Sequence, residues 1–187
     1  MLNSIYIFFF KIGGWKLVGE ISVTLKKSII IVAPHAHWFD FPLGLFARAS
    51  LKTKISFLGK AELFEGIFGF IFRLLDGKPV DRFSNNGMVE SVVKLYNENK
   101  TLHVALAPEG TRKPVSKLRT GFYYIALESK LPIIMILFDY PNKRVIARKP
   151  FYISGNIEED LREIANYYNQ FEGVKKDWIK NYLLEEA

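Results

Sequence analysis

Apolar and polar positions along the chain fall into alternating blocks whose spacing predicts strands and helices in turn. Runs of about four to eight mostly apolar residues, rich in Val and Ile, favour strands. We expect strands at residues 19–25, 29–33, 54–58, 102–107, 133–138 and 145–153. Those at 102–107 and 133–138 are mostly apolar, which is typical of strands buried on both faces.

Helical spacing separates these strands. Apolar residues recur every three to four positions between Met88 and Asn99, which predicts an amphipathic helix. We expect further helices at residues 40–50, 61–75 and 118–129, and from Glu158 toward the C-terminus. Strands that alternate with helices indicate a single α/β domain over residues 1–187, with a mostly buried mixed sheet flanked by helices.

Residues 63–72 are too apolar for a helix with one face in water. We interpret this stretch as core packing, with the lining of a tunnel for an apolar chain or a membrane-facing surface as alternatives. Residues 5–10, Ile-Tyr-Ile-Phe-Phe-Phe, are far shorter than the roughly 20 residues that span a bilayer. They also lack a basic n-region and a signal-peptide cleavage site.

The first 18 residues place aromatic side chains beside Lys11, Trp15 and Lys16. This pattern predicts an interfacial amphipathic helix at residues 1–18, attached to a core at residues 19–187. The alternative is a helix that packs on its own core. We expect a peripheral or monotopic protein at the cytoplasmic face of a membrane.

Composition narrows the classes of function. Of 187 residues, 49% are hydrophobic and 15% aromatic, which is typical of a globular protein. The net charge of +7 suits anionic lipids, phosphorylated substrates or nucleic acid, but the basic residues are dispersed and match no nucleic-acid motif. The chain has no Cys, which excludes disulfides, thiolate metal sites and a Cys acyl-enzyme.

The first candidate for chemistry is His35, which follows a strongly apolar strand. Asp40 lies five residues on, at an expected helix start, and can hydrogen-bond one imidazole nitrogen while the other acts as a base. No Gly-x-Ser-x-Gly motif supplies a nucleophilic Ser. A metal site of His35, His37 and Asp40 stays open as a weak alternative, because a distant third ligand is not evident.

Two constrained loops carry arginines. Residues 107–112, Ala-Pro-Glu-Gly-Thr-Arg, follow a buried strand and form a tight turn in which Arg112 is a candidate phosphate donor. Residues 77–82 form a second loop that ends in Arg82. Neither Gly59-Lys60 nor Gly77-Lys78 is part of a P-loop, because the other residues of that motif are missing.

Together these segments resemble the PlsC-like glycerolipid acyltransferases. Residues 35–40 have the His-x4-Asp form of that family, and residues 77–82 look like its second block. Residues 108–112, Pro-Glu-Gly-Thr-Arg, are similar to its third and most specific block, and Leu131-Pro132 opens a stretch similar to its fourth. The chain departs from the family pattern at Ala36 and His37, where Ser or Thr is common, and at Met135, where a second Pro is usual.

The resemblance implies a site and a reaction. His35 would take the proton of an acceptor hydroxyl, which attacks the thioester of acyl-CoA or acyl carrier protein, while Asp40 orients His35. Arg82 and Arg112 would bind the phosphate of a lysophospholipid acceptor, by default 1-acyl-glycerol-3-phosphate. The remaining substrate-binding candidates are Glu109, Gly110, Thr111 and Lys60.

No cofactor, metal or nucleic acid is expected from the resemblance, and the membrane surface is an expected partner. Three alternatives stay open. A lyso-amino lipid could be the acceptor, the protein could bind lipid without catalysis, or water could replace the acceptor in a thioesterase.

Overall fold

The computed structural model describes residues 2–67, 69–80, 87–172, 174 and 176–184. Its described strands form one seven-stranded sheet in the order β1-β7-β6-β2-β5-β3-β4. Their bounds are β1 (Lys16–Val18), β2 (Lys27–Val32), β3 (Ile55–Lys60), β4 (Gly77–Val80), β5 (Leu102–Leu106), β6 (Ile133–Asp139) and β7 (Arg144–Ala147). All neighbours are parallel except β6 and β7, so the sheet is mixed, as expected.

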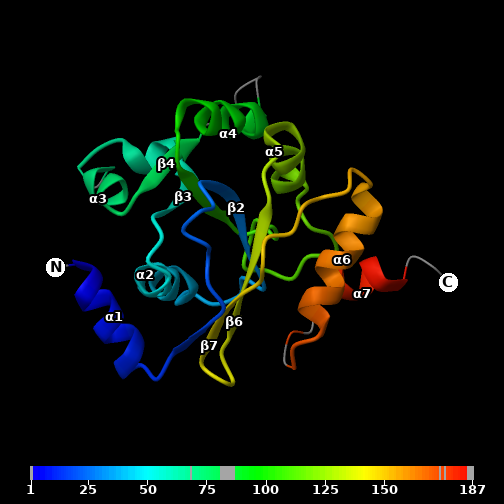
Figure 1. The fold of residues 1–187 in the computed structure, drawn as a ribbon, viewed down its shortest axis with the longest axis horizontal. Helices are drawn as coiled ribbons and strands as arrows, with labels where there is room; N and C mark the ends of the chain where they lie inside the picture. Colours follow the sequence, from blue (N-terminus) through cyan, green and yellow to red (C-terminus); the bar gives the residue numbers. More distant parts are fainter. Residues whose placement is uncertain (1, 68, 81–86, 173, 175, 185–187) are drawn as a thin grey trace.

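Helices cover both faces of the sheet (Figure 1). They are α1 (Leu2–Ile12), α2 (Asp40–Ser50), η1 (Ala61–Phe64, a 3₁₀ helix), α3 (Gly69–Leu74), α4 (Gly87–Glu98), α5 (Gly121–Ser129), α6 (Ile157–Asn169) and α7 (Asp177–Leu184). Alternate side chains of the central strands point to opposite faces. Ile29 and Ile31 join a core under α4 to α7, whereas Ile30 joins a second core under α1 and α2. The expected α/β fold is therefore confirmed.

The predicted strand at residues 19–25 is wrong, although Ile21, Val23 and Leu25 alternate like a strand. The strand lies earlier, at Lys16–Val18, and ends where Gly19 takes a left-handed φ of +82°. A Cβ on Gly19 would lie 2.2 Å from the Ala147 carbonyl oxygen, so the chain passes β7 too closely for any other residue. Val23 is 84% exposed, in a turn beyond the sheet.

The predicted helix at residues 61–75 is also wrong as a single element. Gly66 adopts a φ of +72° and separates η1 from α3. Gly69 then lies so close to Phe64 that a Cβ would be 2.1 Å from its carbonyl oxygen. Core packing holds for Phe64, which is buried, but the large apolar residues around it are exposed, namely Leu63, Ile67, Phe70, Ile71 and Leu74.

Two other predictions need smaller corrections. The expected strand at residues 145–153 ends at Ala147, and only an isolated bridge between Ile133 and Phe151 continues it. The expected C-terminal helix is two helices, α6 and α7, which pack on each other. The strand β4 was not expected, because residues 77–82 were interpreted as a loop.

The helix expected at residues 1–18 is shorter in the structure, because α1 ends at Ile12 and Lys16–Val18 form the strand β1. Its role at a membrane stays a prediction. Phe10 is buried against α2, so one face of α1 packs on the core as the alternative interpretation expected. Phe8 and Phe9 are exposed, although the Phe9 ring stacks on Phe46 of α2. Among the helices in the described ranges, none is both long and apolar enough to cross a bilayer.

Candidate active site

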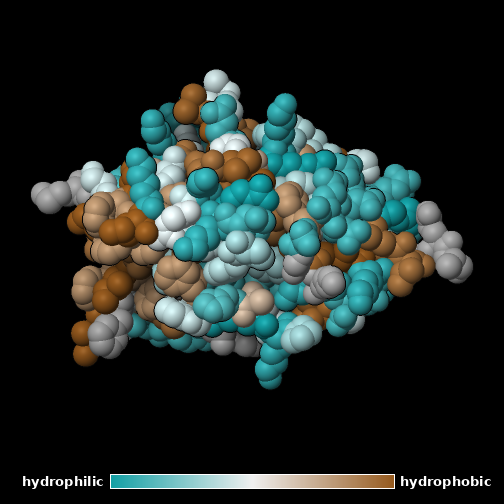
Figure 2. Space-filling model, turned by 90° about the horizontal axis from the view of Figure 1, so that it is seen from below, coloured by the Kyte–Doolittle hydropathy of each residue, from teal (hydrophilic) through white to brown (hydrophobic). Residues whose placement is uncertain are grey.

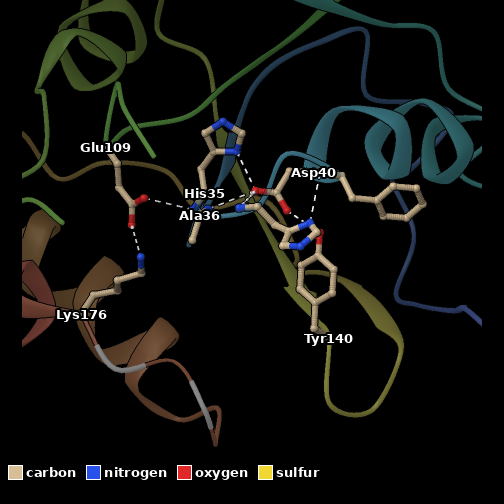
Figure 3. A network of polar contacts seen from close by, with 8 residues as sticks. His35, Ala36, Asp40, Glu109, Tyr140 and Lys176 are labelled. Atoms are coloured by element: carbon tan, nitrogen blue, oxygen red, sulfur yellow. Dashed lines mark hydrogen bonds and ion pairs between the residues drawn. The ribbon is translucent and has the colours of Figure 1, made fainter. Parts of the chain in front are cut away.

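The candidate residues gather where three neighbouring parallel strands end. His35 follows β2, Glu109 follows β5 and Tyr140 follows β6, and β2 lies between the other two in the sheet. The carboxyl edge of a parallel sheet is where α/β proteins place their ligands. The topology therefore brings together segments that are far apart in sequence (Figure 3).

His35 and Asp40 form a close pair. The His35 Nδ1 lies 2.9 Å from the Asp40 Oδ2, and the Asp40 side chain is only 2% exposed. The same oxygen accepts hydrogen bonds from the backbone N–H groups of Ala36, at 3.1 Å, and His37, at 3.0 Å. Because Nδ1–H faces the carboxylate, Nε2 is the ring nitrogen that can take a proton from a substrate.

Tyr140 completes the surroundings of Asp40. Its hydroxyl donates a hydrogen bond to the Asp40 Oδ1 at 2.5 Å, and its ring packs against Trp15. Burial alone would raise the pKa of Asp40, but hydrogen bonds from His35, Tyr140 and the His37 amide outweigh it and lower that pKa. Burial and the neighbouring carboxylate raise the pKa of Tyr140, which keeps its proton and remains a donor.

Glu109 lies beside the backbone of His35. Its buried carboxylate accepts the backbone N–H of His35 on Oε2 at 3.0 Å and the indole N–H of Trp178 on Oε1 at 2.9 Å. The Lys176 Nζ lies 4.0 Å from the same Oε1 (Figure 3). Glu109 was expected to bind substrate, yet the structure directs its carboxylate at the His35 backbone and α7.

The other two histidines have local partners. The His37 Nδ1 accepts the backbone N–H of Phe39 at 3.1 Å, which stabilises the loop before α2. His103 is buried on β5, where its Nδ1 lies 2.8 Å from the Ser28 hydroxyl, and burial lowers its pKa. Within the described ranges, no three His, Asp or Glu residues form a group that could hold a metal ion.

A cavity of about 670 Å³ opens beside the His35–Asp40 pair. This volume lies within the roughly 300–1,000 Å³ of small-molecule sites. Its apolar wall is formed by side chains of β2, α2, β3 and β6, including Val32, Leu45, Phe57 and Phe138. The polar part of the lining consists of the His35–Asp40 pair and of the loop after β5, which contributes Gly110, Thr111 and Arg112.

The loop after β5 depends on Gly110. Its φ is +66°, and its N–H donates to the Ala107 carbonyl at 3.0 Å. A Cβ on Gly110 would lie 2.5 Å from the Cδ and Nε of Arg119, so the arginine crosses the loop where only Gly leaves room. Arg119 also lines the cavity, and its backbone N–H donates to the Pro108 carbonyl at 2.8 Å.

The arginines at the cavity differ in their partners. Arg48 donates to the carbonyls of Ile55 and Leu75, at 3.1 and 2.7 Å, and so has a structural role. The guanidinium groups of Arg112 and Arg119 are exposed, and no described residue forms a hydrogen bond or ion pair with either. They are the two cations that the described part of the cavity offers to an anionic ligand.

Two predicted site residues lie outside this description. Arg82 is outside the described residues, and of Lys60 only the backbone, at the end of β3, is described. Three residues were not anticipated. Arg119 lies at the start of the helix predicted at residues 118–129, where a basic residue is no special signal, whereas Tyr140 and Trp178 reach partners 100 and 69 residues away.

Comparison with known proteins shows which family the chain resembles. Residues 16–139 match the Acyltransferase family. The 1-acyl-sn-glycerol-3-phosphate acyltransferase of Cocos nucifera is 28% identical over 110 residues, which cover 56% of this chain and 35% of the relative. The chain thus spans about a third of the length of that curated relative. The crystal structure of PlsC, the 1-acyl-sn-glycerophosphate acyltransferase of Thermotoga maritima, has the same fold, with a TM-score of 0.54 at 19% identity over 100% of this chain and 79% of that one. Because the family match covers more than half of the sequence, the chain belongs to the Acyltransferase family.

Proposed function

We propose that the chain is an O-acyltransferase that moves a fatty acyl group from acyl-CoA or acyl carrier protein to a lysophospholipid hydroxyl. The proposed acceptor is 1-acyl-glycerol-3-phosphate and the product phosphatidic acid. The observation that carries the proposal is the His35–Asp40 pair, 2.9 Å apart beside a cavity of about 670 Å³. Membership of the Acyltransferase family and the names of the two relatives support it.

His35 acts as a general base in the proposed reaction. Its Nε2 takes the proton of the acceptor hydroxyl as the oxygen attacks the thioester carbonyl carbon. The carbon–sulfur bond then breaks, and the leaving thiolate receives the proton from the imidazolium. Asp40 stays ionised, orients the ring through Nδ1 and stabilises its charged form. The step needs no cofactor and no covalent acyl-enzyme.

Arg112 and Arg119 form the proposed phosphate clamp. Both line the cavity that His35 enters, and both lack a partner among the described residues. A guanidinium can hold two oxygens of a phosphate at once. Arg82 stays a predicted third member of the clamp. Glu109 takes a positioning role, because its carboxylate holds the His35 backbone.

The apolar wall between α2 and the sheet is proposed to take an acyl chain. Phe57 and Phe138 belong to this wall, and Thr111 and Arg112 belong to the polar part of the same cavity lining. An acceptor of this kind resides in a bilayer, so we place the enzyme at the membrane surface as a peripheral protein of the cytoplasmic face. The exposed Phe8 and Phe9 of α1 support an interfacial role for that helix.

Acyl transfer by purified protein tests the proposal. His35→Ala should lower turnover by ~10²–10⁴, because a general base is lost, while the unfolding temperature stays near that of the wild type. His37→Ala is the matched control and should cost less than about tenfold, since its ring accepts the Phe39 amide on Nδ1 and packs beside Trp38 and Tyr140.

Thiol release is measured with and without acceptor. Release without acceptor would identify a thioesterase, and lipid binding without any release would identify a binding module. Near-wild-type transfer by His35→Ala would refute the mechanism.

A further inference from the structure

Exposed apolar side chains gather at one end of the molecule. On α1 they are Ile5, Phe8, Phe9 and Ile12, and on η1, α3 and the turn between them they are Leu63, Ile67, Phe70, Ile71 and Leu74. We call these nine residues the apolar end. In Figure 1, α1 and α3 both lie at the end of the long axis where the chain begins, and α7 lies at the opposite end. Figure 2 shows hydrophobic side chains gathered at that same end.

The local fold directs the second of these groups outward. Phe64 is the buried anchor of its segment, and its ring lies so close to Gly59 and Gly77 that a Cβ on either would be 2.8 Å away. The turn at Gly66 and the close approach of Gly69 bring α3 back over Phe64. On α3, Phe70 and Leu74 are 62% and 66% exposed. The segment is fixed to the core through Phe64, so these two side chains are not needed for core packing.

A helix that lies in water carries polar residues on its outer face, and contiguous exposed apolar surface marks an interaction site. Here two segments more than 50 residues apart in sequence present such surface at the same end of the fold. A single exposed Leu or Phe would need no explanation, but two apolar segments exposed at the same end of the molecule do.

The charge around the apolar end favours a lipid surface as the partner. Lys11 is exposed in the last turn of α1, Lys16 is exposed at the start of β1, and Arg73 is exposed on α3. Basic residues at the rim of an apolar face attract anionic headgroups. Glu62 and Glu65 are also exposed nearby and oppose this attraction, so apolar insertion must supply a large part of the binding.

The apolar end also adjoins the wall of the active-site cavity. Helix α2 packs against α1 and lines the cavity through Phe41 and Leu45. Phe41 meets Phe57 of β3, with ring centroids 5.0 Å apart, and β3 leads directly into η1. Contact between the apolar end and a bilayer would therefore bring lipid beside the wall to which we assign the acyl chain.

We propose that residues 63–67 and 69–74 form a second membrane-docking element, which acts with α1 to bind a bilayer through the apolar end. The delivery of the acceptor along the α2 wall rests on the proposed function, whereas the docking itself does not. Neither element spans the bilayer, and both insert their apolar side chains from one side.

The test uses the full chain and vesicles of phosphatidylcholine, alone or mixed with phosphatidylglycerol. Leu74→Glu removes an apolar contact and adds a charge, and Leu184→Glu is the matched control. Leu184 has the same residue type and nearly the same exposure, 67% against 66%, but ends α7 at the far side of the molecule. Leu74→Glu should weaken the partition onto mixed vesicles by about tenfold or more, and Leu184→Glu should leave it unchanged.

Phe70→Glu provides a second variant and should match Leu74→Glu, with unfolding temperatures of both near the wild type because both positions are exposed. Equal vesicle binding by wild type, Leu74→Glu and Leu184→Glu would overturn the proposal. So would a lipid-free wild-type dimer that Leu74→Glu converts to a monomer, because the apolar end would then bind a second copy of the chain.

Activity separates this proposal from the proposed function. Leu74→Glu should keep the rate of transfer to a short-chain, water-soluble acceptor and lose it only with vesicle-borne acceptor. If the wild type transferred no acyl group at all but its vesicle binding still depended on Leu74, the docking element would stand and the acyltransferase proposal would fall.

Discussion

Gly110 offers the sharpest test of the phosphate clamp, because replacing it changes Arg119 without touching the arginine itself. The Gly110→Ala side chain would lie 2.5 Å from the Cδ and Nε of Arg119, a distance that no real contact sustains. These atoms are in the middle of the side chain, so the whole guanidinium must move. The substitution also places Ala at a φ of +66°.

The two effects differ in size and in the assay that reports them. A left-handed conformation costs a residue with a Cβ about 1–2 kcal/mol, which appears in the free energy of unfolding. A charge-assisted hydrogen bond to phosphate is worth about 1.5–3 kcal/mol, and Arg119 is exposed, so the lower figure applies. That figure corresponds to about a tenfold rise in the KM for a phosphate-bearing acceptor.

Gly155→Ala serves as a control that introduces backbone strain at a positive φ without displacing Arg119. Gly155 has a φ of +100°, and an added Cβ there would meet nothing within 4 Å. This variant should therefore lose stability as Gly110→Ala does but keep the wild-type acceptor KM. Kinetics are compared for the phosphate-bearing acceptor and its dephosphorylated analogue, and unfolding is followed by circular dichroism.

A double-mutant cycle completes the experiment. In an Arg119→Ala background, Gly110→Ala should cost stability but raise the acceptor KM no further, because the group it displaces is gone. Equal acceptor KM values for Gly110→Ala, Gly155→Ala and the wild type would refute the role of Arg119. A lyso-amino lipid would then become the better acceptor to test.

Three further substitutions probe the groups around the pair. Tyr140→Phe keeps the ring but removes a donor to Asp40, so kcat should fall by about tenfold while the acceptor KM stays constant; a change confined to KM would contradict this positioning role. Trp178→Phe leaves one oxygen of the buried Glu109 without its indole donor and should lower the free energy of unfolding by about 1–3 kcal/mol, which thermal unfolding would detect. An unchanged unfolding temperature would contradict this contribution of the Trp178 hydrogen bond. Burial would raise the pKa of Asp139, but hydrogen bonds from Arg144 and Asn142 outweigh it and lower that pKa. Its ionised form thus stabilises the fold above pH ~4 and loses that effect as the pH falls, so Asp139→Asn should be less stable than the wild type at pH 7 and the gap should narrow below pH ~4.

Local sequence was enough to predict the central strands and the position of the pair. The strands β2, β5 and β6 are made mostly of apolar residues, and runs of this length and composition favour buried strands. The segment 35–40 could be placed because it follows one of these strands and precedes a helix that begins at Asp40. Both inferences use neighbours in sequence and the carboxyl edge of a parallel sheet.

Tertiary contacts decided the elements that were predicted wrongly. Residues 19–25 alternate like a strand, yet the close pass of Gly19 beside Ala147 ends β1 before them. Residues 61–75 have the composition of a helix, but the chain turns at Gly66, where φ is positive, and Phe64 is buried before this turn. In each case a glycine allows a close backbone approach, of Gly19 to Ala147 and of Gly69 to Phe64, that the pattern of apolar residues does not reveal.

Two of the side chains that support the pair lie beyond the residues that match the Acyltransferase family model. The family match ends at residue 139, and Tyr140 is the next residue, while Trp178 lies on α7. Asp40 has one oxygen held by His35 and two backbone amides and the other by Tyr140, so its carboxylate cannot rotate without breaking a contact. Glu109 likewise ties the His35 backbone to α7. A chain cut after residue 139 would keep every recognised motif but lose both supports, which is why we attribute the geometry of the pair to the whole fold and not to its motifs alone.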